Sequence, residues 1–317
     1  MRKIALSLAI IGLAVPLLAA APAQAQAPRT WVSGVGDDAN ATNGNLCSRT
    51  APCRSFSGAI GATTAGGEIN CLDPGDFGGV LITKSITISC EAGTAGSLSP
   101  GGALTLVLIT AAATDVVTLR GLDFEGLKTT SYGIRVRQAK EVHIEKCTVR
   151  DFTAAGIAID TISSATVFLY VVDSVISSNH GGVWLPSAGG FKVATLKNVV
   201  ITGSEVDGVS LASSNVYANV TDSIISGNGG SAVVTLASTT TANVERSTIA
   251  NNEFAGLYAA ASGSTIRASG NGIYNNTYGV LIAQGAAIQS DGTNKHGNSN
   301  GGVQAPNASF GRHSYPE

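Results

Sequence analysis

The sequence predicts an all-β fold, a right-handed parallel β-helix that is a single-stranded solenoid of about 24-residue coils with an N-terminal cap, and two repeated phrases support this. The first phrase is a glycine followed by an apolar, a variable and a second apolar residue. It recurs every 23 to 26 residues, within the range expected for stacked repeats. It begins at Gly133, Gly156, Gly182, Gly208, Gly256 and Gly279, with a variant at Val233. We expect a strand at each phrase, with both apolar residues buried and the residue between them facing outward.

The second phrase follows about fifteen residues later and predicts another strand and a tight turn. It spans residues 173–179 and is echoed at 222–228 and 246–252. Its last position is polar in successive coils: Asn179, Ser204, Asn228, Asn252 and Asn276. Asparagine tolerates the left-handed backbone conformation, and identical amides one coil apart can hydrogen-bond. We therefore expect these asparagines to form a structural ladder at a turn.

A leucine-rich repeat is the competing solenoid at this period. It requires leucine where this chain has Ser174, Ser223 and Ser247, and it needs a helical or extended convex side. The connecting segments, such as 237–244, consist of small and β-branched residues that favour short strands and turns. The parallel β-helix is therefore the favoured solenoid.

The repeats resemble those of the pectate-lyase-like family of right-handed β-helix proteins. Residues 31–38 and 51–60 are similar to the entry strand and capping helix that close the N-terminal end of such solenoids, and residues 67–77 and 82–88 resemble their first coil. The resemblance covers about residues 30–300. It implies the fold but no single activity, because the same coil carries lyases, hydrolases and adhesin-like stalks.

A targeting segment is expected before a single elongated domain. Arg2 and Lys3 precede the apolar run 4–21, and small residues at 23–27 offer a signal-peptide cleavage pattern. A retained membrane anchor is the alternative. The predicted organisation is a signal peptide at 1–25, an entry strand and cap at 26–66, the β-helix at 67–300 and a loosely ordered C-terminal tail at 301–317.

The charge of the mature chain bears on its partners. Two of the 19 basic residues lie in the signal segment, so 17 remain against 21 acidic residues, a net charge of about −4. This balance excludes a basic surface for nucleic acid or anionic lipid, and no later segment is apolar and long enough to span a bilayer. We expect a secreted or periplasmic protein, a monomer, with no nucleic-acid partner and no membrane insertion after signal removal.

Export makes the five cysteines interpretable. Cys47, Cys53, Cys71 and Cys90 all lie in the cap and first coil, where two disulfides are expected in an oxidising compartment. Four cysteines allow three pairings, and the sequence does not choose among them. Cys147 occupies the inward position that serines hold in later coils, so we expect a buried structural thiol and not a nucleophile. No cysteine or histidine stands at metal-ligand spacing.

Outward positions of the first phrase contain the candidate glycan-binding residues. The expected row is Arg135, Ala158, Trp184, Ser210, Thr235, Tyr258 and Leu281, and Arg137 and Asp160 begin a second row beside it. Because neighbouring strands lie about 4.8 Å apart, the two arginines and Asp160 would be close, and Trp184 and Tyr258 would lie about 14 Å apart. Arginine binds carboxylates and aromatic rings cover sugar faces, so these five residues could bind a glycan.

Structural roles for the same residues remain the alternative. Arg137 and Asp160 could form a surface ion pair, and the Trp184 ring could pack under the loop 186–191. The short sequence at 179–182 superficially resembles the histidine-glycine motif of polygalacturonases. The paired aspartates and the Arg-Ile-Lys motif that accompany it in those enzymes are missing here. This argues against His180 as a catalytic residue.

No catalytic constellation is recognised, so the catalytic residues are unknown. A lyase would need clustered outward carboxylates to hold calcium and a base to abstract a proton. Asp123, Asp151 and Asp160 fall on different segments of consecutive coils. We expect an exported β-helix protein that binds a polysaccharide or another cell-surface component without a cofactor or metal. The alternative is a polysaccharide lyase acting on a uronate-containing polymer, which could require Ca²⁺.

Overall fold

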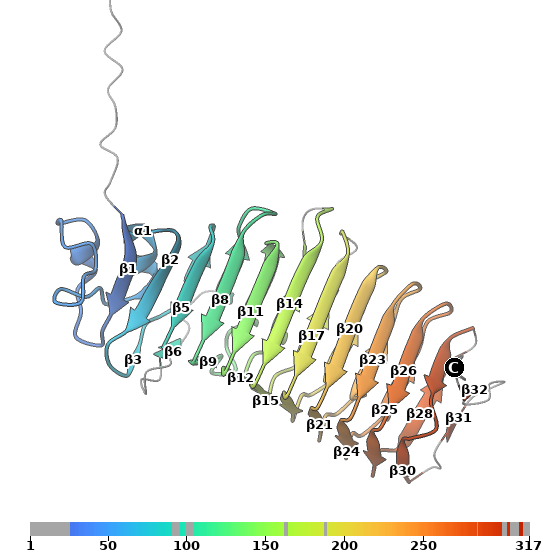
Figure 1. Cartoon of the computed structure of the whole chain (residues 1–317). Coiled ribbons are helices and arrows are strands. Elements are labelled where there is room, and N and C mark those ends of the chain that lie inside the picture. Colours follow the sequence, from blue (N-terminus) through green and yellow to red (C-terminus); the bar gives the residue numbers. More distant parts are fainter. Residues whose placement is uncertain are drawn as a thin grey trace, which may run out of the picture.

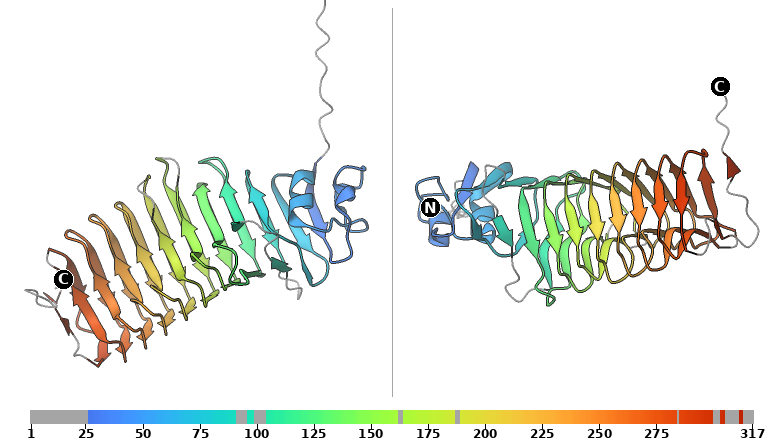
Figure 2. Two further views of the ribbon diagram at one scale, coloured as in Figure 1. Left: turned by 180° about the vertical axis from the view of Figure 1, so that it is seen from behind. Right: turned by 90° about the horizontal axis from the view of Figure 1, so that it is seen from below.

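The chain forms an elongated parallel β-helix (Figure 1). The computed structural model describes residues 26–90, 96–98, 104–161, 164–186, 189–283, 285–299, 303–304 and 311–312. Within these ranges every ladder between named strands is parallel, and each strand pairs with its counterparts one coil before and after. The predicted fold class is confirmed. Figure 2 shows the stacked coils from behind and from below, with the cap at one end and the last coils at the other.

Three sheets run along the solenoid, and a typical coil passes from sheet II to sheet I and then to sheet III. Sheet I contains twelve strands in the described ranges: β1 (Ala27–Val32), β2 (Thr63–Cys71), β5 (Ile86–Ser89), β8 (Val116–Arg120), β11 (Glu141–Glu145), β14 (Val167–Val172), β17 (Lys192–Lys197), β20 (Val216–Thr221), β23 (Thr241–Glu245), β26 (Thr265–Ser269), β29 (Ala287–Ser290) and β32 (Gly311–Arg312).

Sheet II contains the strands of the first repeated phrase. Its ten strands in the described ranges are β4 (Val80–Ile82), β7 (Thr105–Thr110), β10 (Tyr132–Gln138), β13 (Ala155–Ile159), β16 (Gly181–Leu185), β19 (Val209–Leu211), β22 (Val233–Thr235), β25 (Ala255–Ala259), β28 (Tyr278–Ile282) and β31 (Val303–Gln304).

Sheet III contains the short strands of the second phrase. Its ten strands in the described ranges are β3 (Gly75–Asp76), β6 (Gly96–Leu98), β9 (Leu122–Glu125), β12 (Thr148–Arg150), β15 (Val175–Ser177), β18 (Val200–Thr202), β21 (Ile224–Ser226), β24 (Thr248–Ala250), β27 (Gly272–Tyr274) and β30 (Lys295–Gly297).

The N-terminal end of the solenoid is closed by a short helix. Before it the chain forms a 3₁₀ turn, η1 (Asp38–Ala41). Helix α1 (Phe56–Ala62) begins where the Ser55 side chain accepts a hydrogen bond from the Gly58 N–H, a typical N-cap arrangement. The Phe56 ring of this helix lies 5.2 Å from the Phe77 ring. The predicted cap is therefore present, and aromatic packing holds it against the first coil.

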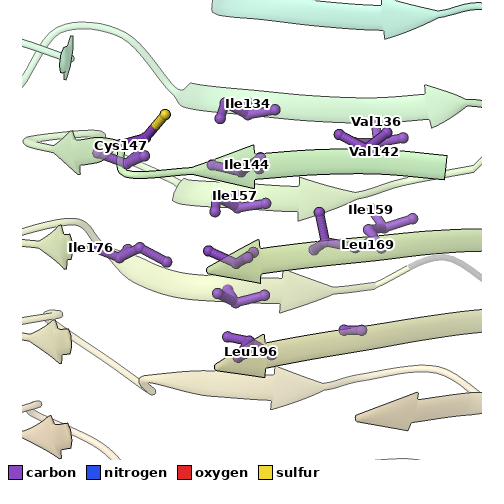
Figure 3. Close-up of a cluster of buried hydrophobic side chains, with 14 of the residues drawn as sticks. Ile134, Val136, Val142, Ile144, Cys147, Ile157, Ile159, Leu169, Ile176 and Leu196 are labelled. Atoms are coloured by element: carbon purple, nitrogen blue, oxygen red, sulfur yellow. The ribbon is translucent and has the colours of Figure 1, made fainter. Parts of the chain in front are cut away.

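The core is a set of stacked apolar columns. Inward residues of each strand alternate with outward ones, and side chains such as Ile134, Ile157, Val142 and Leu169 are fully buried. Figure 3 shows several of these side chains pointing into the space between the sheets. Repetition of the same period-two pattern in each coil makes the columns continuous.

Two corners in each coil are held by a residue in the left-handed conformation. At the corner between sheets III and II this residue is Ser178, Asn251 or Asn275, each with a φ between 55° and 58°. The predicted asparagine ladder follows directly after it, and its amides are buried. Our assignment of the left-handed conformation to the ladder asparagines was therefore wrong by one residue. Their amides face inward and bond to the next coil instead.

The glycine of the first phrase is explained by close contact between coils. A β-carbon at Gly182 would lie 2.4 Å from the carbonyl oxygen of Gly208 and 2.8 Å from the Ile201 side chain. No side chain fits at these distances. The phrase therefore begins with glycine, because the strand meets its neighbour and the sheet III side chains there.

The cysteines of the cap form the two predicted disulfides. Cys47 is bonded to Cys53, and Cys71 is bonded to Cys90. The first bond closes the loop beside the entry strand β1, and the second joins sheet I to the segment that follows β5. The structure thus selects one of the three pairings that the sequence left open. The remaining cysteine, Cys147, is buried and reduced.

Two predicted segments lie largely outside the described residues. The signal peptide, 1–25, lies wholly outside them, as does most of the C-terminal tail, 301–317. Within that tail, Val303–Gln304 pairs with β28 and Gly311–Arg312 pairs with β29, so sheets II and I continue beyond residue 300. Among the described residues, no helix has the length and apolar character needed to cross a membrane.

Candidate functional site

The outer face of sheet II presents one row of side chains in register. Strand pairing aligns Arg135, Ala158, Trp184, Ser210, Val234, Tyr258 and Leu281. The sequence analysis placed Thr235 in this row, and that was wrong. Thr235 faces inward, is fully buried and donates to the Ser264 hydroxyl at 2.9 Å. Ala232 stands where the other coils have glycine, so the phrase begins one residue earlier than expected.

Asp160, the acid that was predicted to lie close to Arg135 and Arg137, pairs with Arg135 and not with Arg137. The Arg135 guanidinium donates from Nε to an Asp160 carboxylate oxygen at 3.1 Å and from a terminal nitrogen to the same oxygen. It also lies over the Tyr132 ring, 4.7 Å from its centroid. The charge of Arg135 is therefore already balanced by a carboxylate.

Arg137 stands apart because β10 has an irregularity at this point. The pairing of β10 with β7 shifts register between Val136 and Gln138, which indicates a bulge at Arg137. The Arg137 Nε is buried and has no hydrogen-bond partner among the described residues. Bulges redirect side chains, and this one separates the two arginines that the sequence placed in neighbouring rows.

A buried lysine lies close enough to influence the same cluster. Lys192 begins β17 and is fully buried, and its ammonium donates to the Ser213 hydroxyl at 3.3 Å. Burial lowers the pKa of Lys192, and the Asp160 charge opposes this shift. Sequence analysis missed this residue, although the alternation of Lys192, Ala194 and Leu196 along the strand places all three on the inward side.

A groove runs along the border between sheet II and the turns that lead into it. Its volume is about 510 Å³, and it passes from β10 to the residue that follows β22. The lining residues come from five consecutive coils, so the groove is about 19 Å long. Residues that line it include Tyr132, Thr153, His180, Trp184, Asp207 and Ser210. A depression of this length can hold several units of an extended chain.

An aromatic pair, Tyr132 and Trp184, forms part of the groove wall. The two rings are parallel within 2°, and their centroids are 6.4 Å apart. A sugar ring between them would need about 7 Å, twice the usual contact distance, so the pair does not form a slot for a sugar. The Arg135 guanidinium covers one face of Tyr132. Both aromatic side chains are partly exposed.

Polar groups at the turns complete the groove. The His180 Nδ1 lies 2.9 Å from a Glu205 carboxylate oxygen, and this contact holds the pKa of Glu205 below its usual range. Lys128 contacts Glu205 and Asp151 on the same edge, at 3.8 and 3.6 Å. Asp207 accepts a hydrogen bond from the Ser231 N–H at 2.8 Å, and burial raises the pKa of its carboxyl group.

Comparison with known proteins agrees with this architecture. A family model described as "Right handed beta helix region" matches residues 163–313. The crystal structure of pectate lyase Pel9A is similar with a TM-score of 0.64 and 15% sequence identity, covering 90% of this chain and 82% of that chain. The chain is a right-handed β-helix repeat protein with a pectate-lyase-like fold. At this identity the likeness establishes the fold alone.

Two further solved structures resemble this β-helix protein more weakly. One is the A-module of mannuronan C-5 epimerase AlgE4 from Azotobacter vinelandii, with a TM-score of 0.41 and 12% identity over 76% of this chain and 89% of that one. The other is ORF18 of Geobacillus virus E2, with a TM-score of 0.30 and 12% identity over 75% and 53%. No curated protein sequence matches the chain.

The five predicted glycan-binding residues of the β-helix protein fall into four places. Trp184 lines the groove. Arg135 and Asp160 form their ion pair beside the aromatic pair, whereas Arg137 lies further along β10. Tyr258 belongs to a separate aromatic cluster, with the Phe254 ring at 5.5 Å, and Phe254 in turn contacts Tyr278 at 5.7 Å. The structure therefore brings together fewer of these residues than the rows suggested.

Three groove residues were not predicted as binding residues. Tyr132 directly precedes the glycine of its phrase and could have been found by extending that phrase by one position. His180 and Asp207 belong to turns, and sequence periodicity does not show which way turn side chains point. Among the described residues, no group of three or more His, Cys, Asp or Glu side chains is arranged to hold a metal ion.

Proposed function

We propose that this β-helix protein is exported and binds a glycan chain along the sheet II groove without cleaving it. The observation that carries the proposal is the partly exposed Tyr132–Trp184 pair in the wall of a groove of about 510 Å³. Aromatic rings cover the apolar faces of sugars at low conformational cost, because the ring has few rotatable bonds. The chain would lie along the solenoid axis and across the strands.

Hydrogen-bonding groups line the groove together with the aromatic rings. Thr153, Ser210 and Asp207 line the groove with hydroxyl and carboxylate groups that can bond to sugar hydroxyls. These few polar groups on a largely apolar floor are the usual composition of a small-molecule or glycan site. They fix orientation, and the rings supply most of the contact area.

The pairing of the ionisable groups favours binding over catalysis. His180 is in contact with Glu205, and Asp207 accepts the Ser231 N–H. General acid–base catalysis needs groups positioned to exchange protons with the substrate, and here the His180 ring contacts Glu205 and the Asp207 carboxylate is held by a backbone N–H. The groove is therefore better suited to holding a chain than to breaking it.

Export is supported by the disulfides. Cys47–Cys53 and Cys71–Cys90 both lie in the N-terminal part of the solenoid. Disulfides persist in extracellular and periplasmic compartments and are rare in the cytosol. The predicted signal peptide at 1–25 is consistent with the same destination.

The test of binding compares Trp184→Ala with Tyr217→Ala. Tyr217 is an exposed tyrosine on β20 of sheet I, a different sheet from that of the groove, so it controls for loss of a surface ring. Retention on a panel of immobilised glycans is measured for both variants and the parent. We expect Trp184→Ala to weaken binding about tenfold or more, the effect of removing a buried aromatic contact worth at least about 1.4 kcal/mol. Equal retention of all three proteins would refute the proposed site.

A polysaccharide lyase remains the second candidate, favoured by one observation. Arg137 is half-buried, its Nε has no hydrogen-bond partner among the described residues, and its guanidinium could bind the carboxylate of a uronate unit. The fold resembles that of a pectate lyase. Incubation with uronate polymers, with and without calcium, would show unsaturated products by their absorbance. Products lost in Arg137→Ala would establish this candidate in place of pure binding.

A further inference from the structure

We infer that the glycan accepted by the sheet II groove is a neutral polysaccharide and not a polyuronate. The inference rests on the proposed function, because it names the substrate class of the same groove. It follows from which charges reach the groove, how the nearby cations are paired and what the floor is made of.

Few charged side chains reach the groove. Apart from the Tyr132 phenol, the ionisable side chains that line the groove are His180 and Asp207. His180 lies 2.9 Å from a carboxylate oxygen of Glu205, which brings a second acid to the rim. Neither lysine nor arginine appears among the described lining residues. A uronate carboxylate would therefore meet acids, with no free cation to compensate.

The cations beside the groove are already paired with carboxylates. Arg135, beside the aromatic pair, is bound by Asp160, and its guanidinium covers Tyr132. Lys128, on the opposite edge, contacts Asp151 and Glu205. A polyanion would have to displace an existing carboxylate at each of these cations, so they offer it little net attraction.

Arg137, whose Nε has no hydrogen-bond partner among the described residues, is displaced from the groove. Arg137 lies two residues beyond Arg135, about 7 Å further along β10, on the side away from the turns that form the groove wall. It does not belong to the groove lining. A chain seated on Trp184 would not reach it through the same sugar unit.

The groove also presents an apolar surface to a ligand. Val206 and Leu236 line it and are 40% and 47% exposed, which is high for apolar side chains. With Trp184 they form a surface that matches the C–H faces of a neutral pyranose. The C–H face of a neutral sugar loses little free energy of hydration when it is buried against this surface. A carboxylate buried there loses its hydration without gaining a partner.

The experiment compares each neutral glycan with its own charged form. Cello-, manno- and galacto-oligosaccharides are titrated against the whole protein beside the same oligosaccharides oxidised at C6 to uronates. We expect the neutral member of a bound pair to bind at least tenfold tighter, with little dependence on salt. We expect Asp207→Asn to reduce the difference in affinity between the neutral and the oxidised oligosaccharide. The substitution removes the negative charge that a uronate must approach.

The possible outcomes separate this inference from the proposed function. Tighter binding of the uronate member, weakened by added salt and by Trp184→Ala, would overturn the neutral preference and leave glycan binding at the groove intact. An Asp207→Asn variant with an unchanged ratio of the two affinities would overturn the role of Asp207 in discrimination. Absence of binding to either member, or equal effects of Trp184→Ala and Tyr217→Ala, would remove the proposed function, and the inference would fall with it.

Discussion

The side-chain amide of Asn252 donates to the side-chain oxygen of Asn276, one coil further along, at 2.8 Å. The Asn252 oxygen in turn accepts the amide of Asn228 at 2.9 Å, and the ladder ends at Asn298. Each ladder oxygen also accepts the backbone N–H of the residue one coil earlier, as Asn252 does from Asn228 at 3.2 Å. Buried backbone groups at a corner that the sheets leave unpaired are satisfied in this way.

The first prediction is that Asn252→Ala destabilises the solenoid. The substitution removes the oxygen that accepts both the backbone N–H and the side-chain amide of Asn228, so two buried donors lose their partner, which costs about 1–3 kcal/mol for each unsatisfied group. Thermal unfolding followed by circular dichroism should show a melting temperature lower by several degrees. The matched control is Asn243→Ala. Asn243 bonds to Asn219 on the outer face, where water can replace the amide, so its effect should stay within about 0.5 kcal/mol. Equal effects of the two substitutions would refute the structural importance of the inner ladder.

The second prediction concerns the single free thiol. Cys147 is 2% exposed, its N–H donates to the Ser174 hydroxyl, and burial raises the pKa of its thiol to about 12. The thiolate, which is the reactive form, is scarce at neutral pH. Without reductant, a thiol reagent at pH 8 should label no cysteine of the native protein and one per chain after denaturation. Rapid labelling of the native protein would show that Cys147 is accessible and not part of the core.

The period of the coil, its strands and its ladder were predictable because each repeats a local pattern many times. Ile134, Ile157 and Val183 each stand one place after a glycine, and a period-two pattern needs no knowledge of distant residues. The pattern failed at Val233, where Ala232 replaces the glycine within a run of apolar residues. Two registers fit such a run, and only pairing with the neighbouring coils decides between them.

The site was less predictable because it depends on relations between coils of unequal length. Arg137 and Asp160 stand in one row, on adjacent coils of an ideal solenoid, but β10 has a bulge at Arg137, and Asp160 pairs with Arg135 instead. His180 and Asp207 reach the groove from turns, whose side-chain directions carry no periodic signal. Trp184 was found because it occupies a strand position, where the alternation of inward and outward side chains is fixed.

The last prediction is a pH-dependent gain of stability in Asp207→Asn. Burial raises the pKa of Asp207 in the folded protein above its ordinary value, so the folded state favours the protonated acid. A raised folded-state pKa gives a stabilising contribution that is complete at low pH and is lost as the pH rises through that pKa. At pH 7 the parent protein therefore carries a penalty that the neutral asparagine removes, while an asparagine oxygen can still accept the Ser231 N–H at this site.

Melting temperatures of the parent and the Asp207→Asn variant, measured from pH 7 downward, test this reasoning. The variant should melt higher at pH 7, and the difference should shrink as the pH falls through the folded-state pKa of Asp207 and vanish once the acid is protonated in both states. Asp173→Asn is the matched control, because Asp173 lies on an exposed corner where its carboxylate accepts the Asn198 amide. A stability difference for Asp207→Asn that is the same at every pH would mean that the substitution acts through packing or hydrogen bonding and not through the charge of a buried acid.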